Sequence, residues 1–461
     1  MKRFLKFLID ILSAVPLLVL GNAFCLWHTV QDIKIKLIIL FFLIIYYLGC
    51  LFLPERKQAQ SRKLAVLSHG IRLIRQGCIC SVMQIPVSGN QISTLLMNHM
   101  MIHPAPEWLN SGLLIGNLLM FLLMLAGLFL GGVFRTVVSS KQVKPIWYLF
   151  LILFWWTPVI NLIIFHHIGK IARKEFYFER AKAELNIARQ ESEICKTKYP
   201  VLLVHGIFFR DWQIFNYWGR IPAELRKNGA RIFYGKQQSA QSIEKSALEL
   251  HQQIHAVLEQ TGAEKINIIA HSKGGLDSRY AIAKLGDAPY VASLTTISTP
   301  HHGCAWVDDI LQKIPESMQN WLDNKYRSVF QVLGDTSPSF LEGVYDLTAE
   351  HSKIFNQECP VPEEVFCQCR MSEMSKAFSA PFPLWFSYLC MKHFDSSAES
   401  DGLVTADSAC LNGKAFDLLK LSGTRGISHG DMIDLNRENI PGFDVREYYV
   451  SILKELKQKG F

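Results

Sequence analysis

Hydrophobic residues are unevenly distributed along this chain of 461 residues. Long apolar runs with few charges lie in the first part, whereas the rest alternates short apolar runs with polar segments. A run of about 20 apolar residues is long enough to cross a bilayer as a helix. We therefore predict an all-α membrane region over residues 1–169 with four transmembrane helices, at about 7–27, 37–53, 113–134 and 146–168.

The first run, residues 7–27, follows basic residues and also has the length of a signal peptide. The segment Asn22-Ala23-Phe24-Cys25 is a poor cleavage site, and further apolar runs follow it. We therefore predict a first membrane helix here. Glycines in and before the third run would allow helices to approach closely. They are Gly112, Gly116, Gly127, Gly131 and Gly132.

Basic residues cluster in two segments beside the apolar runs, after the second run and after the fourth. The positive-inside rule places such segments in the cytoplasm. We expect a multi-pass membrane protein with both chain ends, and the domain that follows, on the cytoplasmic side. The net charge of +8 indicates contact with anionic lipid headgroups of the bilayer. No nucleic-acid-binding motif accompanies it, so we expect no nucleic-acid partner.

Residues 170–198 are charged and lack Pro and Gly, which predicts a helical linker. Beyond residue 199, short buried-strand patterns alternate with helical ones. The expected strands are 201–206, 230–234, 265–270 and 291–298, and the expected helix is 242–260. This alternation predicts a parallel sheet with right-handed crossovers in residues 199–461, with the active site at the carboxyl ends of the strands.

The apolar run before Ala270 breaks at Ala270-His271-Ser272-Lys273-Gly274-Gly275, and a helical pattern follows. A strand that turns tightly into a helix around a serine is typical of a nucleophile elbow. Small residues two positions before and after the serine are needed because the strand and helix backbones nearly touch. A small-x-Ser-x-Gly match by chance is common, but the flanking patterns favour Ser272 as a nucleophile.

A serine nucleophile needs a base, an acid that orients the base, and donors for the oxyanion. Asp401, in a turn before Gly402, and His429, in a later loop, follow the serine in the order that elbow enzymes show. Asp395, Asp407 and His393 are weaker competitors. The oxyanion donors are expected to be the backbone N–H groups of Ile207 and Lys273, while the Lys273 side chain is expected to be solvated. His205, His271, His301 and His302 are expected to be structural, and His271 is close enough to the serine to matter.

The segment from residue 199 onward resembles the bacterial triacylglycerol lipases of the α/β-hydrolase fold. The matching motifs are Tyr199-Pro200-Val201-Leu202-Leu203-Val204-His205-Gly206, Asn216-Tyr217-Trp218-Gly219, Ile221-Pro222, Ala270-His271-Ser272-Lys273-Gly274-Gly275, Ser298-Thr299-Pro300-His301-His302-Gly303, Gly334-Asp335-Thr336, Asp346-Leu347-Thr348 and Asp401-Gly402-Leu403-Val404. The resemblance implies a mostly parallel sheet with helices on both faces. It also implies Ser272, Asp401 and His429 as the triad, and Ile207 and Lys273 as oxyanion donors.

The chain departs from that family in several respects. Many of those lipases hold a structural calcium near the catalytic His, partly through an acidic residue two positions after it. Asp431 matches this position without evident partners, so calcium stays open and no cofactor or metal is required. The secreted members carry a signal and often a disulfide. Here the 11 Cys show no framework spacing, and Cys367 and Cys369 are interpreted as small buried hydrophobes on one face of a strand.

Residues 304–340 are apolar at helical spacing and are predicted to form a lid, with ordinary core packing as the alternative. The apolar residues are Trp306, Ile310, Leu311, Ile314, Met318, Trp321 and Leu322. We expect a membrane-anchored serine hydrolase that cleaves carboxylic esters of lipids. The alternatives are a phospholipase or an acyltransferase with the same triad, or a non-catalytic membrane scaffold.

Overall fold

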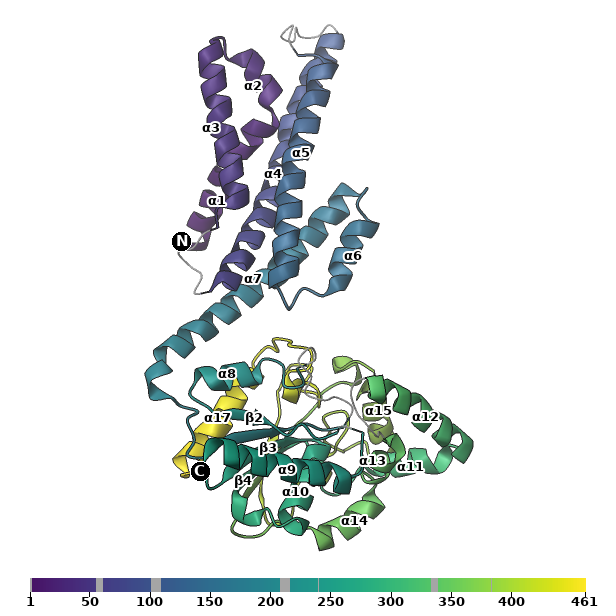
Figure 1. The fold of residues 1–461 in the computed structure, drawn as a ribbon. Helices are drawn as coiled ribbons and strands as arrows, with labels where there is room; N and C mark the ends of the chain where they lie inside the picture. The colour runs from purple at the N-terminus through teal and green to yellow at the C-terminus, as the bar shows by residue number, and fades with distance from the viewer. Residues whose placement is uncertain are drawn as a thin grey trace. The chain divides into compact units, whose positions relative to one another are not determined.

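The computed structural model describes residues 2–54, 61–100, 109–207, 216–238, 240–332, 339–382 and 384–461. The chain forms two compact units, Met1–Leu185 and Asn186–Phe461. Figure 1 shows that the first unit is built of helices and that the second surrounds a sheet. Each unit is described separately.

The helices of the first unit are α1 (Lys2–Gly21), α2 (Ala23–Thr29), α3 (Ile33–Phe52), α4 (Arg62–His99), α5 (Ser111–Ser139), α6 (Pro145–Leu153) and α7 (Pro158–Ala188). Two of the described helices, α3 and α5, are long and apolar enough to cross a membrane. A third candidate is the pair formed by residues 7–21 of α1 and α2, which meet at a bend of 76°. The second and third expected spans therefore correspond to the single helices α3 and α5, whereas the first, residues 7–27, is divided at Asn22 into α1 and α2.

The fourth expected span, residues 146–168, is not one helix. Helix α6 ends at Leu153, and α7 begins at Pro158. Proline cannot donate a backbone hydrogen bond, and it disfavours helical geometry in the residue before it, so the chain turns at this point. At nine residues α6 is too short to span a bilayer, since a helix rises about 1.5 Å per residue.

Helix α4, of 38 residues, follows the second span and packs against α5 through glycines. A Cβ on Gly132 would lie 3.1 Å from the Gly70 oxygen, so the small side chains permit this close approach, as expected for Gly132. Two basic residues of the segment that follows the second apolar run have partners inside this unit. Arg75 pairs with Asp10 at 2.7 Å, and Arg72 donates to the Leu53 oxygen at 2.8 Å. The sequence pattern did not reveal either contact.

The second unit holds one parallel sheet with strand order β2-β1-β3-β4-β5-β6. The strands are β1 (Val201–Val204), β2 (Ile232–Tyr234), β3 (Ile266–His271), β4 (Val291–Ile297), β5 (Phe366–Ser372) and β6 (Ala415–Leu419). The α-helices are α8 (Ile221–Lys227), α9 (Ile243–Thr261), α10 (Lys273–Lys284), α11 (Ala305–Lys313), α12 (Glu316–Val332), α13 (Phe340–Tyr345), α14 (Ala349–Glu358), α15 (Leu384–Phe394), α16 (Ala406–Ala409) and α17 (Val445–Gln458). The order reverses between β1 and β3, and in open parallel sheets such a reversal marks the ligand-binding edge.

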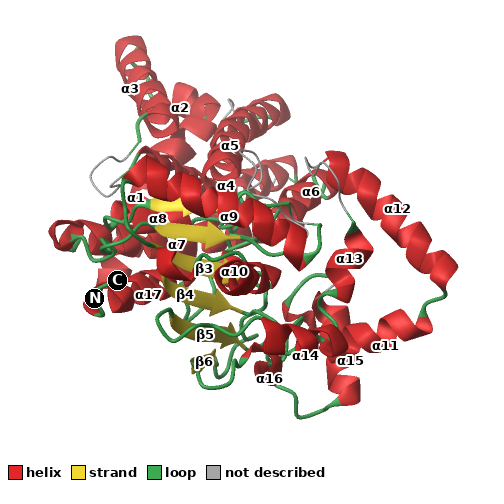
Figure 2. Ribbon diagram, turned by 60° about the horizontal axis from the view of Figure 1, so that its bottom comes forward, coloured by secondary structure: helices red, strands yellow, loops and turns green. Residues whose placement is uncertain are grey.

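Helices cover both faces of the sheet (Figure 2). Alternate residues of a strand point to opposite faces. Leu203 of β1 therefore joins a core formed with α8 and α17, whereas Leu202 and Val204 join a second core formed with α9 and α10. Helix α9 begins where expected, because the Ser242 side chain accepts from the Lys245 N–H, and it ends at Gly262, whose φ is 64°.

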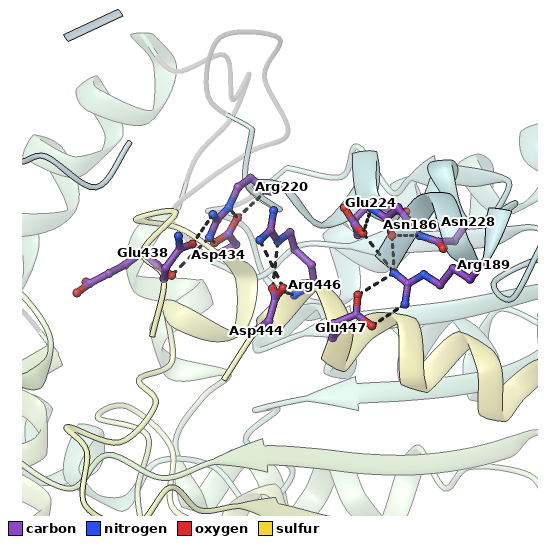
Figure 3. Close-up of polar contacts among 11 residues, drawn as sticks. Asn186, Arg189, Arg220, Glu224, Asn228, Asp434, Glu438, Asp444, Arg446 and Glu447 are labelled. Carbon is purple, nitrogen blue, oxygen red and sulfur yellow. Dashed lines mark hydrogen bonds and ion pairs between the residues drawn. The ribbon is translucent and has the colours of Figure 1, made fainter. Parts of the chain in front are cut away.

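The segment after α7 is fastened inside the second unit by Arg189 (Figure 3). Its guanidinium donates to both oxygens of Glu447, each at 2.7 Å, and also to Glu224 at 3.3 Å. A planar guanidinium and a carboxylate match in this bidentate geometry. Cys195 follows and is fully buried in the core beside α17. Residues 186–198, expected as the end of a linker, thus belong to the second unit.

Candidate active site

Ser272 stands between β3 and α10 with a strained backbone. Its φ is 53° and its ψ is −132°, a conformation that L-residues rarely adopt. A Cβ on Gly274 would lie 2.4 Å from the His205 oxygen, and one on Gly275 would lie 2.2 Å from Thr299 Oγ1. The strand and helix backbones therefore meet as an elbow requires, and this places the serine at the carboxyl end of a central strand.

The loop after β1 passes directly beside the serine. A Cβ on Gly206 would lie 2.7 Å from the Ser272 Cβ, so only glycine allows this approach. The next residue is Ile207, and Lys273 is the first residue of α10. Within the described part of the chain, neither of their N–H groups donates to a backbone oxygen. Lys273 therefore directly follows the serine, and Ile207 directly follows the glycine that touches it.

Asp401 and His429 form a buried pair. Nδ1 of His429 lies 2.8 Å from Oδ2 of Asp401, and the side chain of Asp401 is fully buried. Oδ1 of Asp401 accepts the N–H groups of Leu403 at 3.0 Å and Val404 at 2.9 Å. With Oδ1 held in this way, Oδ2 is fixed toward the imidazole. The carboxylate accepts the proton on Nδ1, which leaves the lone pair of Nε2 available as a base.

The imidazole of His429 packs against His271, the residue before the serine, with ring centroids 4.4 Å apart. This contact places His429 beside the elbow. Nδ1 of His271 lies 2.7 Å from the Tyr217 hydroxyl, which also accepts the Gly206 N–H at 2.9 Å. Complete burial lowers the pKa of His271 well below its ordinary value, and the neighbouring His429 lowers it further.

His271 therefore packs against His429 on one side, and Tyr217 links it to the loop after β1 on the other. The position of His271 beside Ser272 gave a sequence signal for its part in the site. Tyr217 lies in a motif shared with the lipase family, and no local sequence pattern distinguishes its hydroxyl from that of any other tyrosine.

The competing acids and base lie elsewhere. Asp395, Asp407 and His393 are exposed, and Oδ1 of Asp395 accepts from the Ser397 N–H at 2.8 Å. A cavity of about 490 Å³ lies on this side of the Asp401 loop, and Asp395, Leu403 and Asp407 are among its lining residues. No residue of the expected triad lines it.

The expectation that the Lys273 side chain is solvated is wrong. Its ammonium is buried and lies 2.6 Å from Oδ1 of Asp277 and 3.0 Å from Oγ of Ser246. Burial raises the pKa of Asp277 to about 7, although the Lys273 ammonium opposes this shift. Sequence reasoning missed the pair because lysine is usually exposed, although the spacing of four residues along one helix gave a weak signal.

Asp431 does not fit a calcium site. Both of its oxygens accept from Arg425, at 3.0 and 2.7 Å, and Oδ2 also accepts the Ser428 N–H at 2.8 Å. The guanidinium supplies the positive charge that a calcium ion would bring. The loop after His429 is held further by Asp434, whose carboxylate binds the Arg220 guanidinium at 2.8 Å through each oxygen (Figure 3).

The segment expected as a lid, residues 304–340, contains α11 and α12 and ends at the first residue of α13, with residues 333–338 outside the described part of the chain. In α11, Val307 is buried in a cluster with Val404, and the Trp306 indole donates to the Leu403 oxygen at 2.9 Å. In α12, Met318 and Trp321 are exposed. The first helix therefore packs as core beside the Asp401 loop, whereas the second presents apolar side chains to solvent.

Residues 199–379 match the family described as alpha/beta hydrolase fold. The triacylglycerol lipase of Pseudarthrobacter phenanthrenivorans is 34% identical over 177 residues, 36% of this chain and 54% of that protein. The triacylglycerol lipase of Burkholderia plantarii is 34% identical over 177 residues, 36% of this chain and 49% of that protein. Among solved structures, the mature lipase BlEst2 of Bacillus licheniformis is 20% identical with a TM-score of 0.41, over 56% of this chain and 92% of that one.

The chain spans about half the length of the curated relatives that it matches. The similarity to these lipases lies in the second unit, which has the α/β-hydrolase fold. The first unit contributes apolar helices that lie outside this match.

Proposed function

We propose that this protein is a membrane-anchored serine hydrolase that cleaves carboxylic esters of lipids, with Ser272 as nucleophile, His429 as base and Asp401 as the orienting acid. The main support is the strained φ of 53° at Ser272, at an elbow whose neighbouring residue touches the Asp401–His429 pair. Further support for an enzyme comes from the α/β-hydrolase fold of the second unit and from its similarity to triacylglycerol lipases.

In the proposed reaction, Oγ of Ser272 attacks the ester carbonyl while Nε2 of His429 accepts its proton. The carbonyl oxygen becomes an oxyanion that accepts from the N–H groups of Ile207 and Lys273. His429 then donates the proton to the departing alkoxide, which leaves an acyl ester on Ser272. In the second half, His429 deprotonates a water that attacks the acyl carbonyl, and the proton returns to Ser272.

Exposed apolar side chains on the second unit support a lipid substrate. Met318 and Trp321 of α12 are exposed, as are Phe378 and Phe382, whose rings pack with Trp385. Such surface is costly in water and is typical of a face that meets lipid or another protein. We propose that α12 belongs to a lid whose apolar side faces a bilayer when the site is open.

Labelling and hydrolysis test the proposal. The detergent-solubilised protein should react with a fluorophosphonate and hydrolyse long-chain acyl esters faster than short-chain ones. Ser272→Ala should lose labelling and on the order of 10³-fold or more in kcat. Ser451→Ala is the matched control, because Ser451 lies exposed on α17 and donates to the Tyr448 oxygen of the same helix.

The outcomes separate the alternatives. Activity limited to short-chain acyl esters would indicate an esterase and would contradict the proposal that α12 belongs to a lid. Transfer to an added alcohol in preference to water indicates an acyltransferase, and cleavage of phospholipids in preference to triacylglycerols indicates a phospholipase. Equal labelling and equal rates for wild type and Ser272→Ala would contradict the nucleophile and leave the membrane scaffold.

We further propose that α3, α5 and the bent pair α1–α2 anchor the protein in a bilayer. Support comes from the apolar length of these helices and from the basic residues that flank them.

A further inference from the structure

Two histidines and an aspartate of the hydrolase unit lie in contact with one another outside the proposed active site. His251 and His255 lie one turn apart on α9, and Asp287 lies in the turn after α10. Nδ1 of His251 is 2.9 Å from Oδ1 of Asp287, and Nε2 of His255 is 3.1 Å from the same oxygen. Among the described residues, this is the group of three His, Cys, Asp or Glu donors that meets within 4.8 Å.

Asp287 lacks a full set of partners. Its side chain is completely buried, yet its second oxygen, Oδ2, has no hydrogen-bond partner. A buried carboxylate oxygen without a donor is unfavourable and calls for an explanation, such as an ion.

We propose that His251, His255 and Asp287 bind a divalent transition-metal ion of the zinc class. Imidazole nitrogens with one carboxylate suit zinc, cobalt, nickel or copper, whereas calcium and magnesium prefer oxygen ligands throughout. Histidines at i and i+4 on a helix present their nitrogens to a common point. The separations of 2.9 and 3.1 Å approach the ~3.3 Å edge of a tetrahedron with bonds of about 2.0–2.1 Å.

The open side of the site faces solvent. The side chains of His251 and His255 are 34% and 40% exposed, so a water molecule can take the fourth position. The ring of His255 also packs edge-on against Tyr290 at 4.8 Å, which limits its rotation. The cluster is therefore accessible to an ion from solution while its carboxylate is fixed within the protein.

The site joins the two helices that hold the elbow. Asp287 follows the carboxyl end of α10, whereas Ser272 precedes its amino end. Helix α9 supplies both histidines and also Ser246, the acceptor for the Lys273 ammonium. None of the three ligands is a member of the proposed triad. A bound ion would thus fasten α9 to the end of α10 and stabilise the fold without taking part in ester cleavage.

Metal binding to the full-length protein in detergent is the direct test. After chelator treatment and dialysis, calorimetric titration with Zn²⁺ should give about one ion per chain and raise the thermal unfolding midpoint. Asp287→Asn and His255→Gln should each weaken binding by at least tenfold, by analogy with the loss from perturbed metal sites. His351→Gln is the matched control, since His351 lies in another surface His–Asp pair, 3.5 Å from Asp346.

Cobalt distinguishes this site from adventitious binding to thiols. Co²⁺ bound by nitrogen and oxygen gives visible ligand-field bands without the intense near-ultraviolet band of thiolate ligation. Ser272→Ala should bind Zn²⁺ as the wild type does, so the result is independent of the proposed catalysis. Absence of Zn²⁺ binding by the wild type, or equal binding by Asp287→Asn and His255→Gln, would show a hydrogen-bonded cluster instead.

Discussion

The residue after the proposed nucleophile has its ammonium inside the protein. Lys273 lies 2.6 Å from Asp277 and donates to Ser246 of α9 as well. Removing one partner of a buried ion pair leaves the other charge uncompensated, which is strongly destabilising. The pair therefore holds the first turn of α10 against α9, and through it the N–H that we propose as an oxyanion donor.

Asp277 predicts a pH dependence of stability. Burial raises its pKa to about 7 in the folded protein, above the ordinary value of 3.8. The stabilising contribution is fully present below the ordinary value and is lost as the pH rises through about 7. Thermal unfolding of the wild type should therefore show this contribution decline between these values, by up to about 1.4 kcal/mol per pH unit.

Asp277→Asn should lose that component of the pH slope, whatever its effect on stability at one pH. Asp407→Asn, at an exposed position, is the control and should keep the slope of the wild type. An unchanged slope in Asp277→Asn would mean that Asp277 stays ionised beside Lys273 throughout this range.

At the scale of elements, the elbow depends on close backbone contact between β1, β3 and α10. Gly274→Ala places a methyl group 2.4 Å from the His205 oxygen, a backbone atom that cannot turn away. We expect a loss of several kcal/mol of stability, or displacement of Ser272 with loss of fluorophosphonate labelling. Thermal unfolding and labelling of the purified variant measure both effects.

The matched control for this glycine is Gly89→Ala in α4. A Cβ there meets nothing within 4 Å, and alanine favours a helix over glycine by about 1 kcal/mol. This variant should unfold at or above the wild-type temperature and label normally. A Gly274→Ala protein with wild-type stability and labelling would show that the elbow is looser than these contacts imply.

The loop that bears His429 is held in place by an ion pair. Arg425 binds both oxygens of Asp431, two residues after His429. Arg425→Leu leaves that carboxylate without its cation, so we expect kcat to fall by about tenfold or more as the base loses its position. Steady-state hydrolysis should show the change in kcat, with a smaller change in KM.

The same contacts predict how the enzyme responds to calcium. Because Arg425 already occupies Asp431, adding Ca²⁺ to chelator-treated wild type should leave kcat unchanged. Lys454→Leu, at an exposed position of α17, is the control for loss of one positive charge. Restoration of activity by Ca²⁺ in the wild type would contradict the assignment of Arg425 as the resident cation.

At the scale of the whole molecule, the apolar helices predict firm membrane attachment. The chain should remain in the membrane fraction after alkaline carbonate extraction. This treatment disrupts electrostatic attachment to the membrane surface, whereas a spanning helix is held by its apolar side chains in the bilayer. A reporter fused to the C-terminus shows on which side the hydrolase unit lies: the four expected spans place it in the cytoplasm, whereas three spans with a cytoplasmic segment after α3 place it outside. Release by carbonate would contradict the anchor.

Much of the sheet could be predicted because strand and helix periods are local properties. Local sequence patterns predicted the strands β1 to β4, the start of α9 at Ser242 and the elbow around Ser272. The chain order of Ser272, Asp401 and His429 also indicated the proposed site, since in this topology these segments end at one edge of the sheet.

Only the tertiary structure decided the long-range partners. Asp401 and His429 lie 28 positions apart, and no local pattern encodes their 2.8 Å contact. Nothing local pairs Asp431 with Arg425 or buries Lys273 beside Asp277 either. The break before Pro158 likewise divides a run that hydropathy alone joins. Sequence periodicity fixes which face of an element is apolar, but burial and charge pairing depend on which elements meet, and the cluster of His251, His255 and Asp287 exists only because α9 lies against the end of α10.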